Sequence, residues 1–366
     1  MGAFNGQLNS NEIFSALYNM IISQQVFADN IKGTNSALVD SARTDGSLYG
    51  DTKLYYSTDV LRSHPWGNDA EATNLLALDR PKAPECQKIT LDVFRQIRLT
   101  TDQYLSKRAW SNEGAFQEFS SVMMGWIRET KRVYDSTLYN SYIGTTQGSS
   151  NKATLNIPVG DITETGEEAR RLEAQMIAQS LADLMVEMTD ISRDFNDYKQ
   201  LRSYDKSEIK IVWNSKWLNK ITKLDLPTIF HKDGLLEGLN KDVLPSRYFG
   251  TINTSAGSVT TNTNVRSLYE ADYTDSSSVK HHIFAGDLLP NNVSYLANET
   301  YTEDANIICK VMTKLPPYMS AFEVATSFFN PRSLTENNYL TFGHNTLEYL
   351  KAFPLIQVNA YTTPTE

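Results

Sequence analysis

The stretch GAFQEFSSVMMGWIRETKRVYDSTLYNSYIG, Gly114 to Gly144, predicts one long, uninterrupted amphipathic helix. Its apolar residues recur three and four positions apart, which places them on one face of a helix. Ser111 or Asn112 can cap its start, and Gly144 can end it. About thirty residues at 1.5 Å each make a rod of roughly 45 Å. We expect its core-facing stripe to consist of Phe116, Phe119, Met123, Trp126, Ile127, Tyr134, Leu138 and Tyr142.

The predicted helix also carries a basic cluster. Arg128, Lys131 and Arg132 lie within about one helical turn of each other. Such a cluster can pair with acidic groups on a neighbouring subunit, or it can contact nucleic acid. The sequence leaves this choice open.

A second periodic signal precedes the helix. In QKITLDVFRQIRLTT, residues 87–101, apolar and polar residues alternate, which is typical of a strand with one buried face. Its upstream neighbour, 52–61, is the natural pairing partner. A two-stranded ribbon cannot cover its own apolar face, so we expect a neighbouring subunit to cover it. The expected interface residues on this strand are Ile89, Leu91, Val93, Ile97 and Leu99.

The whole-chain composition limits the classes of function. The chain has 366 residues and a formal net charge of −9, which disfavours a general nucleic-acid binder. Cys86 and Cys309 do not form a metal-binding motif. No signal-peptide pattern and no apolar run of about 18 residues is visible, so we expect no membrane segment.

The remaining segments indicate an extended N-terminal part and a compact C-terminal part. We expect residues 1–31 to form a polar arm whose short helix packs Ile13 and Leu17 on another part of the chain or on another subunit. Thr165 and Glu168 form a capping-box pattern at the start of a helix over 165–192. Residues 250–278 are predicted to be a long polar loop. Residues 208–213 alternate as a strand, and strand-like runs in the final third predict an α+β fold; these runs are 282–284, 305–313, 321–329, 339–342 and 355–361.

No catalytic, cofactor-binding or metal-binding pattern stands out. The pair His281-His282 lies on a predicted strand, where adjacent side chains point to opposite faces and do not chelate one metal easily. An enzyme that uses His281, His282 or Asp287 is the least favoured alternative. We therefore expect a protein that is not an enzyme, with no cofactor and no metal.

The order of these parts resembles the major capsid proteins of tailed bacteriophages, with the Hong Kong ninety-seven phage fold, and among them those of small podophages. ITLDVFRQIRLTTDQYLSKRAW, 89–110, followed by the helix from 114 looks like their ribbon-to-spine passage. KSEIKIVWNSKWLNKI, 206–221, resembles a strand and helix of their axial domain. VATSFFNPRSLTENNYLTFG, 324–343, looks like a late strand and turn of the same proteins.

The resemblance implies domains and partners. This protein would be the head protein of a virion and would be made in the host cytoplasm. Its hexamers and pentamers would form an icosahedral shell around double-stranded DNA. Scaffolding, portal and decoration or head-fibre proteins would be its other partners, and its contact with DNA would be non-specific. Another phage structural protein, or an encapsulin-like compartment shell, is the alternative. The implied parts are an N-terminal arm (1–45), an extended loop (46–104), a peripheral domain (105–165) with a spine helix (114–143), an axial domain (166–350) and a C-terminal return (351–366).

Overall fold

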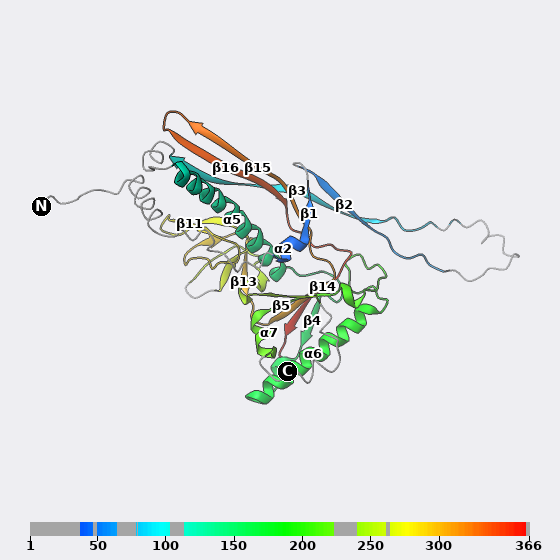
Figure 1. Cartoon of the computed structure of the whole chain (residues 1–366). Coiled ribbons are helices and arrows are strands. Elements are labelled where there is room, and N and C mark those ends of the chain that lie inside the picture. The colour runs from blue at the N-terminus through cyan, green and yellow to red at the C-terminus, as the bar shows by residue number, and fades with distance from the viewer. Residues whose placement is uncertain are drawn as a thin grey trace.

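A computed structural model of the chain shows an upper part, in which a long helix runs along a sheet, and a lower lobe that ends near the C-terminus (Figure 1). Among the described residues, no helix combines the length and apolar character that a membrane-spanning segment needs. The described residues are 37–46, 50–63, 78, 80–102, 113–222, 240–260 and 264–363, without the side chains of 37, 45, 102, 113–121, 123, 124, 222, 240 and 321–323.

The long helix is α5, Glu113–Thr145, one residue longer at each end than the predicted stretch Gly114–Gly144. Ile127, Tyr134 and Leu138 are buried, and Tyr139 and Ile143 extend the same buried face. Phe116, Phe119 and Met123 lie outside the described side chains. The short helix α2, Ala37–Ala42, packs its Leu38 and Val39 into the same core as Leu138.

Trp126 does not lie in this core, which corrects the expectation from periodicity. Its side chain is 40% exposed. The buried face of α5 includes Lys131 and Asp135, one and two turns after Ile127. A search for apolar spacing excludes these two polar positions, and it therefore shifts the expected face toward Trp126.

Among the described residues, the upper sheet has five strands. The sequence predicted only one of the pairings between them. The predicted ribbon is present, because β2, Thr52–Ser57, pairs antiparallel with β3, Glu85–Asp102. The other edge of β3 pairs with β16, Thr335–Asn345, from the far end of the chain. β15, Tyr318–Asn330, and β1, Arg43–Asp45, complete the order β1-β15-β16-β3-β2. Residues 318–345, expected in the compact C-terminal part, therefore belong with the ribbon.

A β-bulge at Asp92 divides β3 into two differently oriented halves. Val93 pairs with His344, while Leu91 pairs with Asn345, so Asp92 is the extra residue. Neighbouring positions on β16 point to opposite faces, so Leu91 and Val93 do too. The Asp92 carboxylate accepts hydrogen bonds from the backbone N and the hydroxyl of Thr346 at 2.7 and 2.8 Å. The alternating apolar residues of β3 therefore serve both faces of the sheet.

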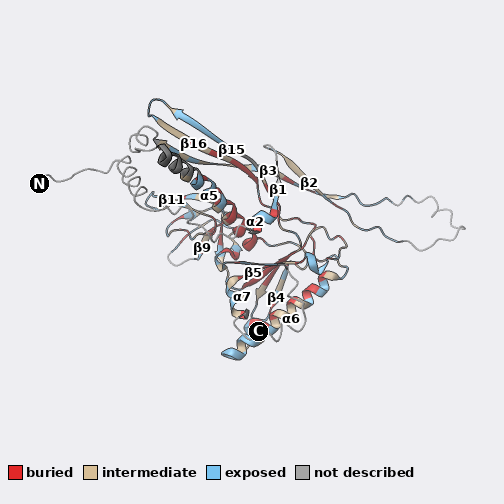
Figure 2. Cartoon of the chain, viewed as in Figure 1, coloured by how far each residue is buried: buried red, intermediate tan, exposed pale blue. Residues whose placement is uncertain are grey.

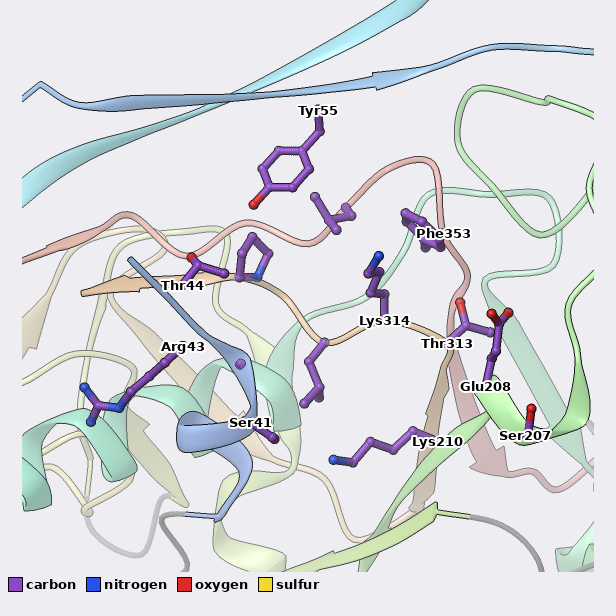
Figure 3. Close-up of a pocket in the computed structure, with 14 residues that line it drawn as sticks. Ser41, Arg43, Thr44, Tyr55, Ser207, Glu208, Lys210, Thr313, Lys314 and Phe353 are labelled. Atoms are coloured by element: carbon purple, nitrogen blue, oxygen red, sulfur yellow. The ribbon is translucent and has the colours of Figure 1, made fainter. Parts of the chain in front are cut away.

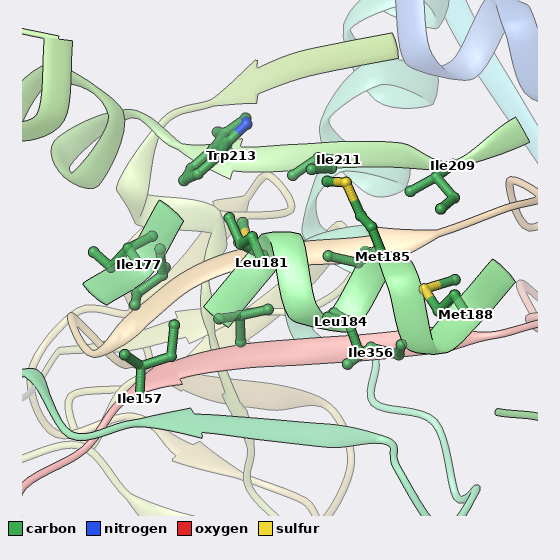
Figure 4. Close-up of a cluster of buried hydrophobic side chains, with 14 of the residues drawn as sticks. Ile157, Ile177, Leu181, Leu184, Met185, Met188, Ile209, Ile211, Trp213 and Ile356 are labelled. Atoms are coloured by element: carbon green, nitrogen blue, oxygen red, sulfur yellow. The ribbon is translucent and has the colours of Figure 1, made fainter. Parts of the chain in front are cut away.

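The lower lobe is built on a second five-stranded sheet. Its order is β4-β17-β14-β5-β6. The helix α6, Glu167–Thr189, lies against one face and supplies Ile177, Leu181 and Met185 to the core (Figure 4). The other face packs beneath the end of α5. The bounds are Thr154–Ile157 for β4, Leu355–Ala360 for β17, Ile307–Met312 for β14, Lys210–Asn214 for β5, Asn240–Leu244 for β6 and Ser215–Thr222 for helix α7.

Two further expectations differ from the structure. The residue at the N-cap of α6 is Gly166, and no side chain caps the helix there, so the Thr165–Glu168 capping box does not form. The described residues of 250–278, which are 250–260 and 264–278, do not form a loop, because they contribute to three small sheets with a core that includes Val265, Tyr273 and Val293. The α+β class is confirmed. The small strands are Gly250–Ile252 (β7), Gly257–Ser258 (β8), Val265–Ser267 (β9), Ala271–Thr274 (β10), Lys280–Ile283 (β11), Ser294–Tyr295 (β12) and Thr300–Glu303 (β13).

Candidate assembly surfaces

One face of the β2–β3 ribbon is covered by its own chain. Ile89 and Leu91 are buried with Met319 and Leu350. Gln87, on the same face, donates from Nε2 to the carbonyl of Tyr349 at 2.9 Å. The expected interface role of Ile89 and Leu91 assumed that this face lacked an internal cover. That premise is wrong, because the chain's own C-terminal region supplies the cover.

The opposite face of the ribbon is open. Register places Leu54 opposite Lys88 and Tyr56 opposite Cys86. Leu54 is 50% exposed and Tyr56 is 64% exposed. We call these four residues the ribbon surface. Since β2 is also an edge strand among the described residues, the ribbon offers both apolar side chains and unpaired backbone groups.

The ribbon is fixed to the lower lobe just beyond Ser57, the last residue of β2. The Asp59 carboxylate accepts from Arg193 Nη1 at 2.6 Å and from the backbone N of Leu201 at 3.0 Å. These hydrogen bonds, Arg193 first, lower the pKa of Asp59 to about 2. Gln200 Nε2 also donates to the carbonyl of Ser57 at 3.2 Å. The ribbon surface therefore lies next to a segment that hydrogen bonds fix to the lower lobe.

A second open region lies between α5 and the outer end of the upper sheet. There, Ile127 and Arg128 face Ala325, Ser327 and Leu340 across a groove of about 490 Å³. Ile97 and Leu99 share the sheet face that carries Leu340, as their pairing with β16 requires. We call this region the distal groove. Exposed apolar side chains on or beside the β15–β16 hairpin, whose outer strand is pale blue in Figure 2, are Val324, Phe328, Phe329 and Leu334.

The basic cluster of α5 is split between the interior and the surface. Lys131 is only 7% exposed, and its Nζ lies 3.1 Å from Asp135 Oδ2 on the same helix. It cannot also reach a neighbour or DNA, which corrects its expected role. Arg128 and Arg132 are exposed, and Arg128 lines the distal groove. Ile13 and Leu17, expected to contact a partner, lie outside the described residues.

The comparisons with known proteins identify the fold. No family model and no curated protein matches the sequence. The structure is similar to a chain in the capsid structure of Staphylococcus phage Andhra, with a TM-score of 0.59, 9% identity, and coverage of 92% of this chain and 87% of that chain. This chain has a phage-capsid fold. A chain in the structure of head fiber and inner core protein gp22 of native bacteriophage P68 is similar at a TM-score of 0.58 and 8% identity, over 88% of this chain and 84% of that chain.

Within this phage-capsid fold, the ribbon, β1 and the lower lobe meet around a pocket of about 600 Å³ (Figure 3). Tyr55 points into it from the ribbon. Lys314 lies over the ring of Phe353, 5.1 Å from its centre, and Lys210 pairs with Asp242 at 2.8 Å. Both contacts lie within the lower lobe, the first as a cation–π contact and the second as an ion pair.

The adjacent histidines His281 and His282 each contact carboxylates nearby. His281 Nε2 lies 3.0 Å from Asp275 Oδ2. His282 lies between two carboxylates, with Nδ1 2.6 Å from Asp272 Oδ1 and Nε2 3.1 Å from Glu270 Oε1. Among the described residues, no group of three or more His, Cys, Asp or Glu side chains is placed to hold a metal ion. The contacts with Asp272 and Asp275 connect β11 to β10 and to the turn that follows it.

Proposed function

We propose that this chain is the major capsid protein of a tailed phage, the subunit that assembles into the icosahedral shell around packaged double-stranded DNA. One observation carries the proposal. The likeness to a chain of the Andhra capsid structure extends over 92% of this chain and 87% of that one, so it is not confined to one element or one lobe. A protein that had borrowed only one of these parts would match over a much smaller share.

The exposed surfaces support assembly with copies of the same chain. The ribbon projects beyond the rest of the upper sheet (Figure 1), and its open face carries Leu54 and Tyr56. The distal groove offers apolar side chains at the opposite end of the same sheet. A surface at one end that fits a groove at the other makes a head-to-tail contact, which closes into rings such as hexamers and pentamers.

The charged residues favour neighbouring subunits as the main partner of α5. The chain has a net charge of −9, and one of its three clustered basic residues, Lys131, is already paired internally. We propose that the exposed Arg128 and Arg132 make contacts in the shell, with acidic groups of a neighbour ahead of DNA phosphates. Scaffolding, portal and decoration or head-fibre proteins are the further partners that we propose for a subunit made in the host cytoplasm and carried in the virion.

Electron microscopy of the expressed full-length chain tests this function. The chain is produced alone and together with the scaffolding protein of its own genome. Closed icosahedral shells of uniform diameter are the expected product in at least one of the two preparations. Only monomers or irregular aggregates in both preparations would contradict the proposal. Shells that enclose a protein cargo in place of DNA during phage growth would favour the compartment alternative.

A further inference from the structure

Lys310 is a fully buried lysine in the middle of the lower sheet. It belongs to β14, whose two neighbours are β5 and β17. Its register partners are Val212 and Gln357, and it shares a face of the strand with Met312, which packs beneath the end of α5. Lysines are almost never fully buried unless their charge is paired. The surroundings of Lys310 therefore need an explanation.

The hydrogen bonds of Lys310 match a neutral amine. Its Nζ donates to the carbonyl of Thr146 at 2.7 Å and to Gln357 Oε1 at 2.5 Å. Gln357 Nε2 donates to Asn359 Oδ1 at 2.9 Å, which fixes the amide so that its oxygen faces the lysine. A neutral lysine amine has two N–H groups and an ammonium has three. Two acceptors satisfy the first form and leave the second with an unpaired N–H in the interior.

The electrostatic surroundings also favour the neutral form. Removal from solvent lowers the pKa of Lys310 to about 7, with smaller opposing contributions from Cys309 and Asp304. Burial raises the pKa of the Cys309 thiol, which keeps it uncharged as well. The groups that face the amine from α5 and β17 are a backbone carbonyl and an amide, both neutral. No described carboxylate forms an ion pair with it.

The two acceptors belong to parts of the chain that are far apart in sequence. Thr146 directly follows the last residue of α5, and Gln357 lies in the C-terminal strand β17. The backbone N of Gln357 also donates to the carbonyl of Ala153, in the segment that connects α5 to the lower sheet. We propose that Lys310 is held as a neutral amine that ties the end of α5 to β17, and that protonation of this amine loosens the tie. The inference does not depend on the proposed shell function.

The direction in which stability changes with pH follows from the pKa of Lys310 in the folded and in the unfolded chain. A lysine in the unfolded chain titrates near pH 10.4. Since the folded-state pKa is lower, the unfolded chain binds more protons between about pH 7 and pH 10.4. Stability therefore rises with pH across this window, and below it the full cost of the buried amine is present.

Thermal unfolding of the full-length chain tests the first half of the proposal. The wild type, Lys310→Met and Lys314→Met are compared at about pH 6 and about pH 9. Lys314 is an exposed lysine four residues away, so its variant carries the same charge change without the burial. We expect the wild type and Lys314→Met to gain several degrees in Tm on going to the higher pH, and Lys310→Met to gain clearly less. Equal gains in all three proteins would overturn the proposal.

Hydrogen exchange tests the second half, and it needs no variant that unfolds. Exchange is followed in the wild type for peptides that cover 145–157 and 353–361, after correction for the intrinsic effect of pH. We expect the protection of these peptides to fall several-fold between about pH 8.5 and pH 6, relative to peptides of α6. Unchanged protection, or a uniform change across the chain, would overturn the proposal even if Lys310→Met does not fold.

Discussion

Arg43 Nη2 lies 2.9 Å from Asp135 Oδ2, and this ion pair joins β1 to the middle of α5. The carboxylate of Asp135 is buried and also accepts from Lys131 Nζ at 3.1 Å and from the Tyr318 hydroxyl at 2.6 Å. Its oxygens thus bind donors from β1, α5 and β15. Three elements that enclose the core beneath α5 are held by one side chain.

Replacing Asp135 should therefore destabilise the fold strongly. In Asp135→Ala, the buried Lys131 loses this carboxylate, and loss of one member of a buried charge pair costs about 3–5 kcal/mol. The matched control is Glu187→Ala, which removes the exposed ion pair with Lys152 and should cost less than about 1 kcal/mol. Urea unfolding of both variants measures the difference. Similar losses in the two variants would contradict the assigned role of Asp135.

Two glycines of α5 should respond in opposite ways to alanine. A Cβ on Gly144 would collide with the backbone carbonyl of Tyr248, which cannot rotate away, whereas a Cβ on Gly125 meets nothing within 4 Å. Gly125→Ala should stabilise the chain by about 0.5–1 kcal/mol, the usual gain inside a helix. Gly144→Ala should destabilise it, because the helix must move away from 248–249. Tm measurements on the two single variants decide this, and a gain for both would show that α5 does not approach Tyr248 so closely.

The sequence predicted α5 and the ribbon because both signals are long. Regular spacing over thirty residues, or alternation over fifteen, leaves little ambiguity about local structure. The faces of these elements were harder to predict. The bulge at Asp92 results from the pairing of β3 with His344 and Asn345, more than 250 positions later. No local sequence pattern predicts it. Trp126 was misplaced because the buried face of α5 contains the internally paired Lys131 and Asp135.

The 250–278 region was missed for a different reason. Its strands are only two to four residues long, and the whole stretch is rich in Ser, Thr and Asn, so its composition resembles that of a loop. They form strands because their partners lie close by, as in the pairing of Tyr273 with His281. The packing of Val265 and Tyr273 with Val293 then stabilises the small sheets. Pairing of this kind depends on tertiary context more than on intrinsic propensity.

His344 should make the protein sensitive to acid. Its Nδ1 donates a hydrogen bond to the carbonyl of Asn345 at 2.8 Å. Its Nε2 therefore accepts a hydrogen bond from the Tyr134 hydroxyl at 2.7 Å. Burial lowers the pKa of His344 below its ordinary value of 6.5. Since the unfolded chain binds a proton first, stability attributable to this residue falls as pH drops below about 6.5.

The variant His344→Gln removes this titration while its amide can keep both hydrogen bonds. We expect its urea midpoint to fall less than that of the wild type between about pH 6.5 and pH 4.5. Lys310 acts at higher pH, so the two effects are separable. Parallel loss of stability in both proteins would assign the acid sensitivity to other groups.

The two faces of the ribbon should behave differently when a charge is introduced. Ile89→Asp places a carboxylate in the core formed with Met319 and Leu350, so the subunit should lose several kcal/mol and fail to fold. Tyr56→Asp and Leu54→Asp lie on the ribbon surface, where the subunit's own stability should change by no more than about 0.5 kcal/mol. These two variants should fold and yet fail to form shells, because the charge disrupts a contact with a second copy.

Tyr361→Asp, at an exposed tyrosine in the lower lobe, is the control for a general effect of added charge. Circular dichroism reports folding, and electron microscopy with sedimentation reports assembly. Normal shells from Tyr56→Asp and Leu54→Asp would show that copies of the chain associate through another surface.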